Sequence, residues 1–530
     1  MTKTVSSEKL FINGRIYTVN AEAPWVDAML VRDGVIQALG SDRELRNAVG
    51  SEVEVVDLEG RMLMPGIHDA HIHLLMSGLK FGFECRVSMD ANADQVAEQL
   101  CDCLKCRSSK LSNWVIGGEF NPYAFEEGTL DRAALDQKFP DRPVYLFDYS
   151  IHHALVNSKA LELAGINAST PDPRGGRFVR RTGSDEPTGE LVERARWPVS
   201  RVIPPYEPDI YRDALRWSQE MAHRFGITSV QEASASLPEL KALRELEEAD
   251  ELKMHVAAHL VWEEVTFAGG LSCEEQEGLI ASRSDHKSRH VNTRFVKCWL
   301  DGAPLGPHFT EARIDAASNR IDQDKILIPE DQLTEALMRF DRDGITLKMH
   351  CAGEGAVRTA LNAVERVRAA NGNDGPLHEI AHAGFVHPDD RPRLARLRVV
   401  AEMSPALWHR KEPEFEPLKA GFKFNTLDAM GTHITIGSDW IITPDPNLFP
   451  ALQGMLERGD ESVDLRKALR MMTLDGARAV GQEKQIGSLE VGKAADFIIL
   501  DRNLFEIPTS DVGETRVLST YFAGDRVYSA

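Results

Sequence analysis

The chain has 530 residues, too long for one simple core, so its length predicts two or more structural units. With 42% hydrophobic and 27% charged residues it has the composition of an ordinary globular protein, and its formal charge of −21 argues against binding nucleic acid or anionic membranes through net charge. The first residues lack the apolar core of a signal peptide, and no apolar stretch approaches the roughly 20 residues of a membrane-spanning helix. The seven cysteines form no framework typical of secreted proteins, which favours reduced thiols and a cytoplasmic location.

The two ends of the chain carry short β patterns. Residues 8–60 alternate such patterns with turns, of which Asn13-Gly14 and Asp33-Gly34 are typical hairpin turns. Residues 483–530 have the same character, with a hairpin expected to turn at Gly524-Asp525. Each piece is too small for a stable core of its own. We therefore predict that residues 1–63 and 483–530 complete one small β-sandwich domain together.

Residues 64–482 alternate β and α patterns, which is typical of a parallel sheet. Eight candidate strands with helical stretches between them favour a closed (β/α)8 TIM-like barrel of the α/β class. A doubly wound open sheet is the alternative. The candidate strands are expected to end at Ile67, Val230, Leu260, Leu300, His350, His382, Met403 and Gly437.

The first two candidate strands are separated by more than 150 residues, far above a normal βα connection. We therefore expect a large insertion after the first barrel strand, over about residues 80–215, with strands of its own. Cys101, Cys103 and Cys106 cluster in a polar helical pattern within it. Because no fourth metal ligand stands nearby, we expect these cysteines to be unpaired.

Residue types that bind metals stand where the candidate barrel strands end. His71 and His73 project from the same face of a strand, and neutral imidazole is the commonest metal ligand. The chemistry of such barrels sits at the carboxyl ends of the strands. Each residue alone has an ordinary structural interpretation, such as a hydrogen-bonded histidine or a salt-bridged lysine, but the set predicts a metal site. The six candidate ligands are His71, His73, Lys297, His350, His382 and Asp439.

These segments resemble the amidohydrolase superfamily of metal-dependent hydrolases, and within it the family 3 branch that includes N-substituted formamide deformylase. The resemblance covers essentially the whole chain. Within the insertion it includes residues 140–144, 152–158, 164–166, 172–176 and 187–189. Its main matching segments are residues 65–73, 297–302, 350–357, 379–382, 437–439 and 487–496.

The resemblance implies a site for two divalent metal ions, which we expect to be zinc. His71 and His73 would bind the more buried ion together with Asp439. The second ion would be bound by His350 and His382. The position of Lys297 corresponds to that of a carbamylated lysine that bridges both ions in binuclear members, because carbamylation turns a cationic amine into an anionic oxygen donor.

The implied reaction cleaves a C–N amide-type bond, of the N-substituted amide or formamide class, in a small organic molecule. A metal-activated hydroxide would attack the carbonyl carbon, with Asp439 as the general base that passes the proton to the leaving nitrogen. The resemblance makes His152 a substrate or oxyanion contact. Trp114 is a candidate for an aromatic wall at the substrate, with buried packing as the alternative.

Other functions stay open at this point. A hydrolytic deaminase, or hydrolysis of a lactam, cyclic imide or ester, would use a similar site, whereas the complete ligand set argues against a metal-stabilised regulatory protein without turnover. His68 stands where the branch usually has an aliphatic residue, Glu354 replaces an aspartate, and residues 303–309 depart from the usual loop. We therefore transfer no substrate from relatives, and expect a homodimer by analogy alone.

Overall fold

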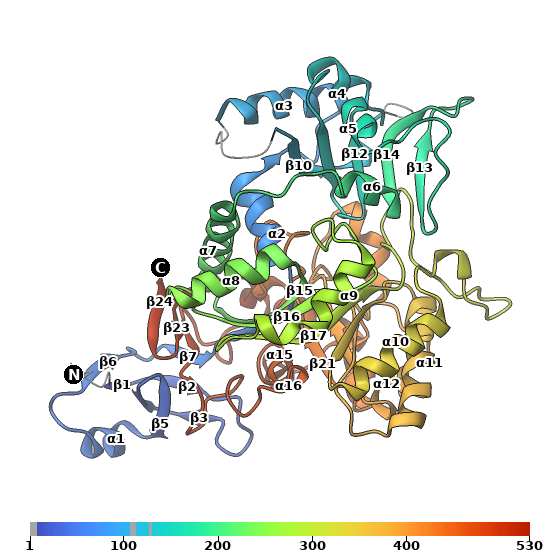
Figure 1. Cartoon of the computed structure of the whole chain (residues 1–530). Helices are drawn as coiled ribbons and strands as arrows, with labels where there is room; N and C mark the ends of the chain where they lie inside the picture. Colours follow the sequence, from blue (N-terminus) through green and yellow to red (C-terminus); the bar gives the residue numbers. More distant parts are fainter. Residues whose placement is uncertain (1–7, 107–112, 127–129) are drawn as a thin grey trace.

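Eight parallel strands form the central sheet of the computed structural model, which describes residues 8–106, 113–126 and 130–530 (Figure 1). A parallel bridge between Ile72 and Trp440 brings the last strand back beside the first, so the sheet closes into the predicted barrel. In order around the barrel the strands are β8 (Ile67–Ile72), β15 (Ile227–Ala235), β16 (His255–Val261), β17 (Val291–Trp299), β18 (Thr346–His350), β19 (Glu379–Ala381), β20 (Val400–Met403) and β21 (Ile434–Ile436).

The first two strands extend further than predicted. β8 begins at Ile67 rather than ending there, and β15 continues five residues past Val230 to Ala235. Both extensions are buried along their whole length, so packing stabilises polar strand ends whose pattern resembles a loop. The other six strands end within one residue of the predicted positions.

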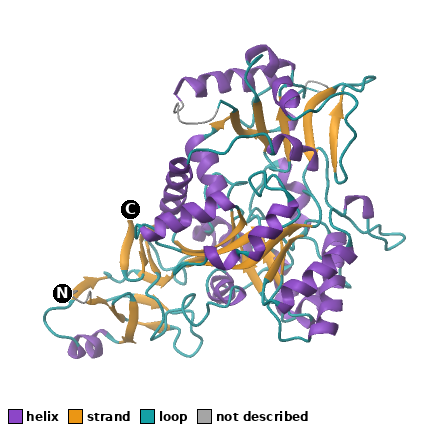
Figure 2. Ribbon diagram, viewed as in Figure 1, coloured by secondary structure: helices purple, strands orange, loops and turns teal. Residues whose placement is uncertain are grey.

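Helices surround the barrel and bury one face against it (Figure 2). In α11 (Glu354–Asn371), Val357, Leu361 and Val364 recur at helical spacing and are fully buried. No helix among the described residues is both long and apolar enough to cross a membrane. The longer barrel helices are α7 (Pro208–Arg224), α8 (Leu237–Glu248), α9 (Cys273–Ala281), α10 (Glu330–Arg342), α11 and α14 (Phe449–Leu456).

Both ends of the chain meet in one small β domain, as predicted. β7 (Met62–Pro65) pairs with β2 (Arg15–Tyr17) on one side and with β22 (Phe497–Leu500) on the other. A second sheet contains, in order, β5 (Val35–Gly40), β4 (Ala28–Arg32), β1 (Glu8–Ile12) and β6 (Glu54–Asp57). It packs against the first sheet through a shared core in which the Phe11 ring contacts the rings of Phe497 and Tyr521. The exact domain boundaries stay predictions.

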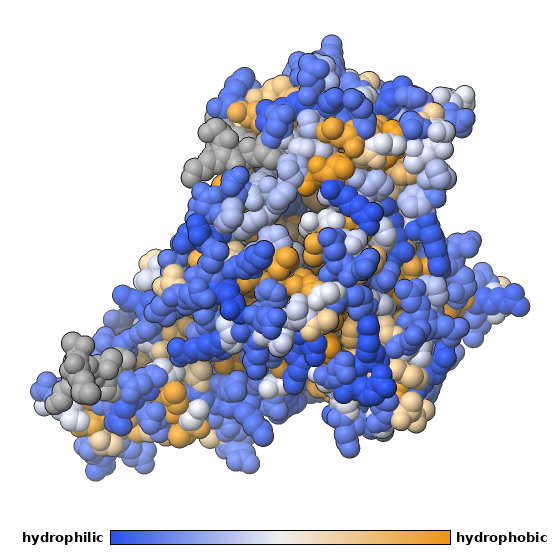
Figure 3. Space-filling view, viewed as in Figure 1, coloured by the Kyte–Doolittle hydropathy of each residue, from blue (hydrophilic) through white to orange (hydrophobic). Residues whose placement is uncertain are grey.

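The insertion forms a six-stranded sheet, drawn above the barrel in Figure 1. In order, its strands are β13 (Gly176–Arg180), β14 (Pro187–Glu193), β12 (His153–Val156), β11 (Val144–Asp148), β10 (Val115–Phe120) and β9 (Cys85–Arg86). One face of this sheet packs against α3 (Ala93–Cys106) and α4 (Ala133–Lys138). Apolar side chains gather where the insertion meets the barrel (Figure 3). The insertion therefore places its inner residues beside the strand ends.

The prediction that Cys101, Cys103 and Cys106 are unpaired is wrong for Cys103. Cys85 in β9 (Cys85–Arg86) and Cys103 in α3 form a disulfide, with Cα atoms 5.8 Å apart. Sequence spacing did not reveal this pair, because it depends on α3 packing against β9. Cys101 is free, while the side chain of Cys106 lies outside the described residues. The disulfide also removes the argument from reduced thiols to a cytoplasmic location.

Candidate metal centre

The barrel brings the six predicted ligands together at the carboxyl ends of its strands. His71 lies in β8 and His73 follows it; Lys297 lies in β17. The other three stand at or just after the ends of β18, β19 and β21. Five of the six residues are buried and His382 is nearly so, so water has little access to these side chains. All six line one small cavity, which we call the metal cavity.

Asp439 lies at the middle of this cluster. Its Oδ1 atom is 3.3 Å from His73 Nε2 and 3.6 Å from His71 Nε2, and its Oδ2 atom is 4.0 Å from His382 Nδ1. Oδ1 is buried yet has no hydrogen-bond partner, although burying an unpaired carboxylate oxygen is costly. Ligand atoms of His71, His382 and Asp439 all lie within 4.8 Å of one another, so these residues fit a bound divalent cation.

Three of the candidate histidines are in the form that binds a metal. Burial, aided by nearby cationic and imidazole groups, lowers the pKa of His71, His350 and His382 well below the usual value, so their rings are neutral at pH 7. His350 Nδ1 lies 2.7 Å from His382 Nε2, with ring centroids 4.3 Å apart. A neutral ring offers one lone pair, which is what a cation requires.

Neighbouring polar side chains orient the rings of His71 and His73. His71 Nδ1 lies 2.6 Å from a Glu402 carboxyl oxygen, and His73 Nδ1 lies 2.7 Å from the Ser234 hydroxyl. Their Nε2 atoms therefore face Asp439. Sequence reasoning missed both partners, although Glu402 gave a signal: it is a fully buried carboxylate inside the short apolar strand β20. Burial raises the pKa of Glu402 to about 8.

The Lys297 amine is buried and forms no ion pair within the described part of the chain. Its Nζ atom lies 3.4 Å from His71 Nε2 and 4.9 Å from the centroid of the Trp299 ring, and no carboxylate among the described residues forms an ion pair with it. Burial, followed by the charge of Lys348, lowers the pKa of Lys297 to about 8. A larger share of its amine is therefore neutral near pH 7 than in an exposed lysine.

The backbone is strained at two of the candidate ligands. His382 and Asp439 have φ angles of 75° and 51°, in the left-handed region that residues other than glycine rarely occupy. Each such residue costs on the order of 1–3 kcal/mol. The Asp439 amide donates to the His71 carbonyl at 2.7 Å, which helps to hold this conformation. Such strain clusters at functional sites because it aims side chains that a relaxed strand end would not.

The sequence model of the amidohydrolase family matches residues 54–528. The chain belongs to the amidohydrolase family. It is 28% identical to protein LONG AFTER FAR-RED 3 from Arabidopsis thaliana, covering 99% of this chain and 92% of that protein. It is 27% identical to N-substituted formamide deformylase from Arthrobacter pascens, covering 98% of each. The fold is similar to that of an uncharacterized metal-dependent hydrolase from Pyrococcus horikoshii, with a TM-score of 0.72 at 21% identity over 95% of this chain and 99% of that one.

Membership confirms the predicted family and its enzyme class, a metal-dependent hydrolase. The amidohydrolase barrel and its terminal β domain are likewise as the sequence predicted. The number of metal ions, their identity and the roles of the six ligands stay predictions.

His152 enters the amidohydrolase site from the insertion. It lines the metal cavity, and its ring centroid lies 5.2 Å from that of His350. Its Nδ1 atom is 3.1 Å from both carboxylate oxygens of Glu193 in β14 (Pro187–Glu193). Burial alone would lower the pKa of His152, but the Glu193 carboxylate more than offsets this and raises it. In turn, His152 lowers the pKa of Glu193 despite its burial.

Trp114 does not reach the site. Its side chain packs in the apolar core of the insertion, with Ile116 and Tyr145, and lines neither the metal cavity nor the pocket beside it. The structure therefore supports the alternative interpretation of Trp114, which is buried packing. His68 is buried inside the barrel with Nδ1 2.9 Å from the Ser229 hydroxyl, and burial lowers its pKa to about 3. It is therefore a neutral core residue bonded to a side chain rather than to backbone.

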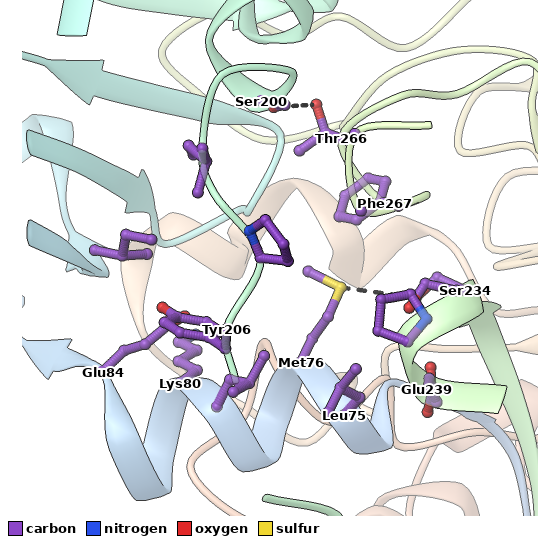
Figure 4. A pocket seen from close by; sticks show the side chains of 18 of the residues that line it. Leu75, Met76, Lys80, Glu84, Ser200, Tyr206, Ser234, Glu239, Thr266 and Phe267 are labelled. Atoms are coloured by element: carbon purple, nitrogen blue, oxygen red, sulfur yellow. Dashed lines mark hydrogen bonds between the residues drawn. The ribbon is translucent and has the colours of Figure 1, made fainter. Parts of the chain in front are cut away.

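Two further cavities adjoin the metal cavity. A side pocket of about 50 Å³ shares His152, His350, His382 and Asp439 with it. A lid cavity of about 180 Å³ lies between the insertion and the barrel (Figure 4). Phe267 lines both the lid cavity and the metal cavity, and its ring stacks on that of His73 at 6.1 Å. The side pocket is therefore the one that opens directly onto the candidate ligands.

Proposed function

We propose that this amidohydrolase cleaves the C–N bond of a small N-substituted amide or formamide, using two divalent ions, zinc by preference. The observation that carries the proposal is the buried, unpartnered Asp439 Oδ1 beside His71 and His73. Neutral imidazoles and a carboxylate are donors that zinc prefers. The substrate class is supported by the similarity over 98% of both chains to a protein named N-substituted formamide deformylase.

Each proposed ion has its own ligands. His71, His73 and Asp439 would hold one, and His350 with His382 would hold the other. When bound, such ions polarise a carbonyl oxygen and lower the pKa of a water from 15.7 to about 7.

Side chains of the protein transfer the proton and stabilise the carbonyl oxygen. Asp439 accepts a proton from the attacking water and delivers it to the leaving nitrogen, so the C–N bond breaks to give an acid and an amine. His152 donates a hydrogen bond from Nε2 to the carbonyl oxygen, because its Nδ1 is engaged by Glu193. The donor is held before the substrate arrives, so little reorganisation is needed during the reaction.

Replacing Asp439 tests its role as the base. Asp439→Asn keeps the shape but loses the basic oxygen, so we expect kcat to fall by at least about 10²-fold. Steady-state kinetics on a panel of N-substituted formamides, amides, lactams and esters, with metal content measured for each protein, checks this. Asp460→Asn, at an exposed carboxylate, is the control. Near-normal turnover in both Asp439→Asn and Asp439→Ala would remove the assignment.

We also propose that Lys297 is carbamylated. Its neutral amine would add to CO₂ and release a proton, giving an anionic carbamate able to bridge both ions. The support is its burial without a carboxylate partner and a pKa lowered to about 8. With ¹³C-bicarbonate, NMR should reveal a carbamate in the wild type that Lys297→Ala lacks, and elemental analysis should find fewer ions in the variant. A Lys297→Ala protein with two tightly bound ions and full activity would refute this.

A further inference from the structure

The side pocket has an apolar wall. Its metal end is formed by polar groups shared with the metal cavity, whereas its other side carries bulky apolar side chains. These come from the segments that follow four different barrel strands, β17, β19, β20 and β21. The wall residues are Leu305, Phe385, Leu418, Phe422 and Ile442.

No lysine or arginine is among the described residues that line the side pocket. Its titratable side chains are His152, His350, His382 and Asp439, all at the end shared with the metal cavity. A carboxylate placed against the apolar wall would lose its hydration without gaining a partner, at a cost of several kcal/mol. The wall thus excludes charged groups and accepts hydrocarbon.

Hydrogen bonds and ring packing hold the Phe422 part of the wall in place. The Arg458 guanidinium donates to the carbonyls of Gly421 at 2.7 Å and Phe422 at 3.1 Å, and the Phe422 amide donates to the Gly384 carbonyl at 2.7 Å. The ring of Phe422 packs against that of Trp408, with centroids 5.2 Å apart. These contacts fix the position of Phe422, so the pocket is preformed rather than made by the ligand.

We infer that the substituent carried by the substrate amide is a short, uncharged hydrocarbon group, and that the side pocket binds it while the carbonyl lies in the metal cavity. This rests on the proposed function. The pocket volume of about 50 Å³ is what makes the group short. Hydrolysis of such a formamide adds water across the C–N bond and yields formic acid and an aliphatic amine.

Two substrates of equal size test the inference on the unmodified protein. N-isobutylformamide and N-formylglycine carry branched substituents with the same number of non-hydrogen atoms, one apolar and one a carboxylate. We expect kcat/KM of the metal-loaded enzyme to be at least about 100-fold higher for N-isobutylformamide, because the wall leaves a carboxylate unpaired. Equal values, or a preference for N-formylglycine, would overturn the inference and leave the proposed function intact.

Adding a cation to the wall should weaken the preference for N-isobutylformamide. Leu418→Lys places an ammonium in the pocket, so we expect the ratio of the two kcat/KM values to shift toward N-formylglycine by at least about 10-fold. Leu163→Lys makes the same change at a leucine that is 47% exposed, and should leave the ratio unchanged. An equal ratio in Leu418→Lys and Leu163→Lys proteins of the same thermal stability would contradict the inference.

Substitutions that each narrow one cavity show whether the substituent binds in the side pocket or in the lid cavity. A Cβ on Gly384 would lie 3.4 Å from the Phe422 ring, so Gly384→Val narrows the side pocket, whereas Ile203→Trp narrows the lid cavity. We expect Gly384→Val to raise KM for N-isobutylformamide about 10-fold more than for N-methylformamide, and Ile203→Trp to affect both alike. The opposite pattern would assign the substituent to the lid cavity and refute the inference.

Failure of the proposed function would give a different result from failure of the inference. If the metal-loaded protein hydrolyses neither isosteric formamide, the proposed function fails. Calorimetric titration with the same two compounds then decides the inference. Tighter binding of N-isobutylformamide, weakened by Gly384→Val, supports the side pocket as a hydrocarbon site, and equal or undetectable binding of both refutes it.

Discussion

Glu193 determines how His152 faces the site. Both of its oxygens lie 3.1 Å from His152 Nδ1, and the Thr310 hydroxyl donates to one of them at 2.5 Å. Gly302 makes room for this carboxylate, since a Cβ there would lie 2.1 Å from Glu193 Oε1. Glu193 itself has a φ angle of 49°, in the left-handed region, so the backbone is strained where it places this carboxylate. We therefore interpret Glu193 as a positioning residue.

Replacing Glu193 should lower turnover more than substrate binding. Glu193→Gln keeps the size of the side chain but loses the charge that orients His152, so we expect kcat to fall about 10–100-fold with a smaller change in KM. Glu190→Gln is a matched control on the same strand, because Glu190 lies 2.6 Å from His308 rather than His152. The interpretation fails if the two variants have the same kcat, or if Glu193→Asp does not restore part of it.

The convergence of the six candidate ligands was predictable from sequence, whereas the side chains that orient them were not. A histidine, lysine or aspartate at the end of an apolar strand is visible in the sequence, and the barrel rule says where strand ends meet. Glu402 and Ser234 orient rings that lie 331 and 161 residues away in the chain, so only the folded barrel pairs them. The packing of Trp114 was not predictable for the same reason, because this residue lies just before β10 (Val115–Phe120) and no local pattern shows whether it packs in the insertion core or faces the site.

The closure of β8 against β21 is the element-scale feature on which the site depends. Asp69 in β8 accepts hydrogen bonds from the backbone amides of His71 and Ser438, which joins the two strand ends. Gly437 allows them to approach, because a Cβ there would lie 2.4 Å from His71 Cβ and 2.7 Å from His71 N. The barrel can therefore bring His71 and Asp439 together only with glycine at this position.

Gly437→Ala should separate these strand ends. We expect a loss of about 1–3 kcal/mol in the free energy of unfolding and a clear loss of metal affinity, because His71 must shift. Denaturant unfolding and metal titration measure the two effects. Gly278→Ala, in a helix where nothing lies within 4 Å of the new Cβ, should keep metal affinity and slightly stabilise the protein. A Gly437→Ala protein that matches the wild type in both measurements would contradict this account.

Periodicity predicted the elements better than their ends and cross-links. In β18 the buried apolar residues Leu347 and Met349 alternate with polar ones, which is the pattern of a strand, and both β18 and β20 end where predicted. The end of β15, residues 231–235, is largely polar and resembles a loop, yet burial in the barrel makes it a strand. The Cys85–Cys103 disulfide joins two elements of the insertion whose packing no local pattern encodes.

At the scale of the whole molecule, distant parts of the chain converge on one cavity. The barrel supplies candidate ligands from His71 to Asp439, and the insertion contributes His152 from above. The terminal β domain is anchored directly to the first barrel strand, since β7 precedes β8 by one residue and pairs with β22 near the other end of the chain. The central claim is that this convergence holds divalent cations.

Anomalous diffraction from crystals of the zinc-loaded protein tests that claim most directly. We predict two anomalous peaks, one about 2.0–2.2 Å from ligand atoms of His71, His73 and Asp439 and one at the same distance from His350 and His382, with density beyond the Lys297 amine between them. Zinc bound only outside the metal cavity, or no peak in zinc-loaded crystals, would contradict the account.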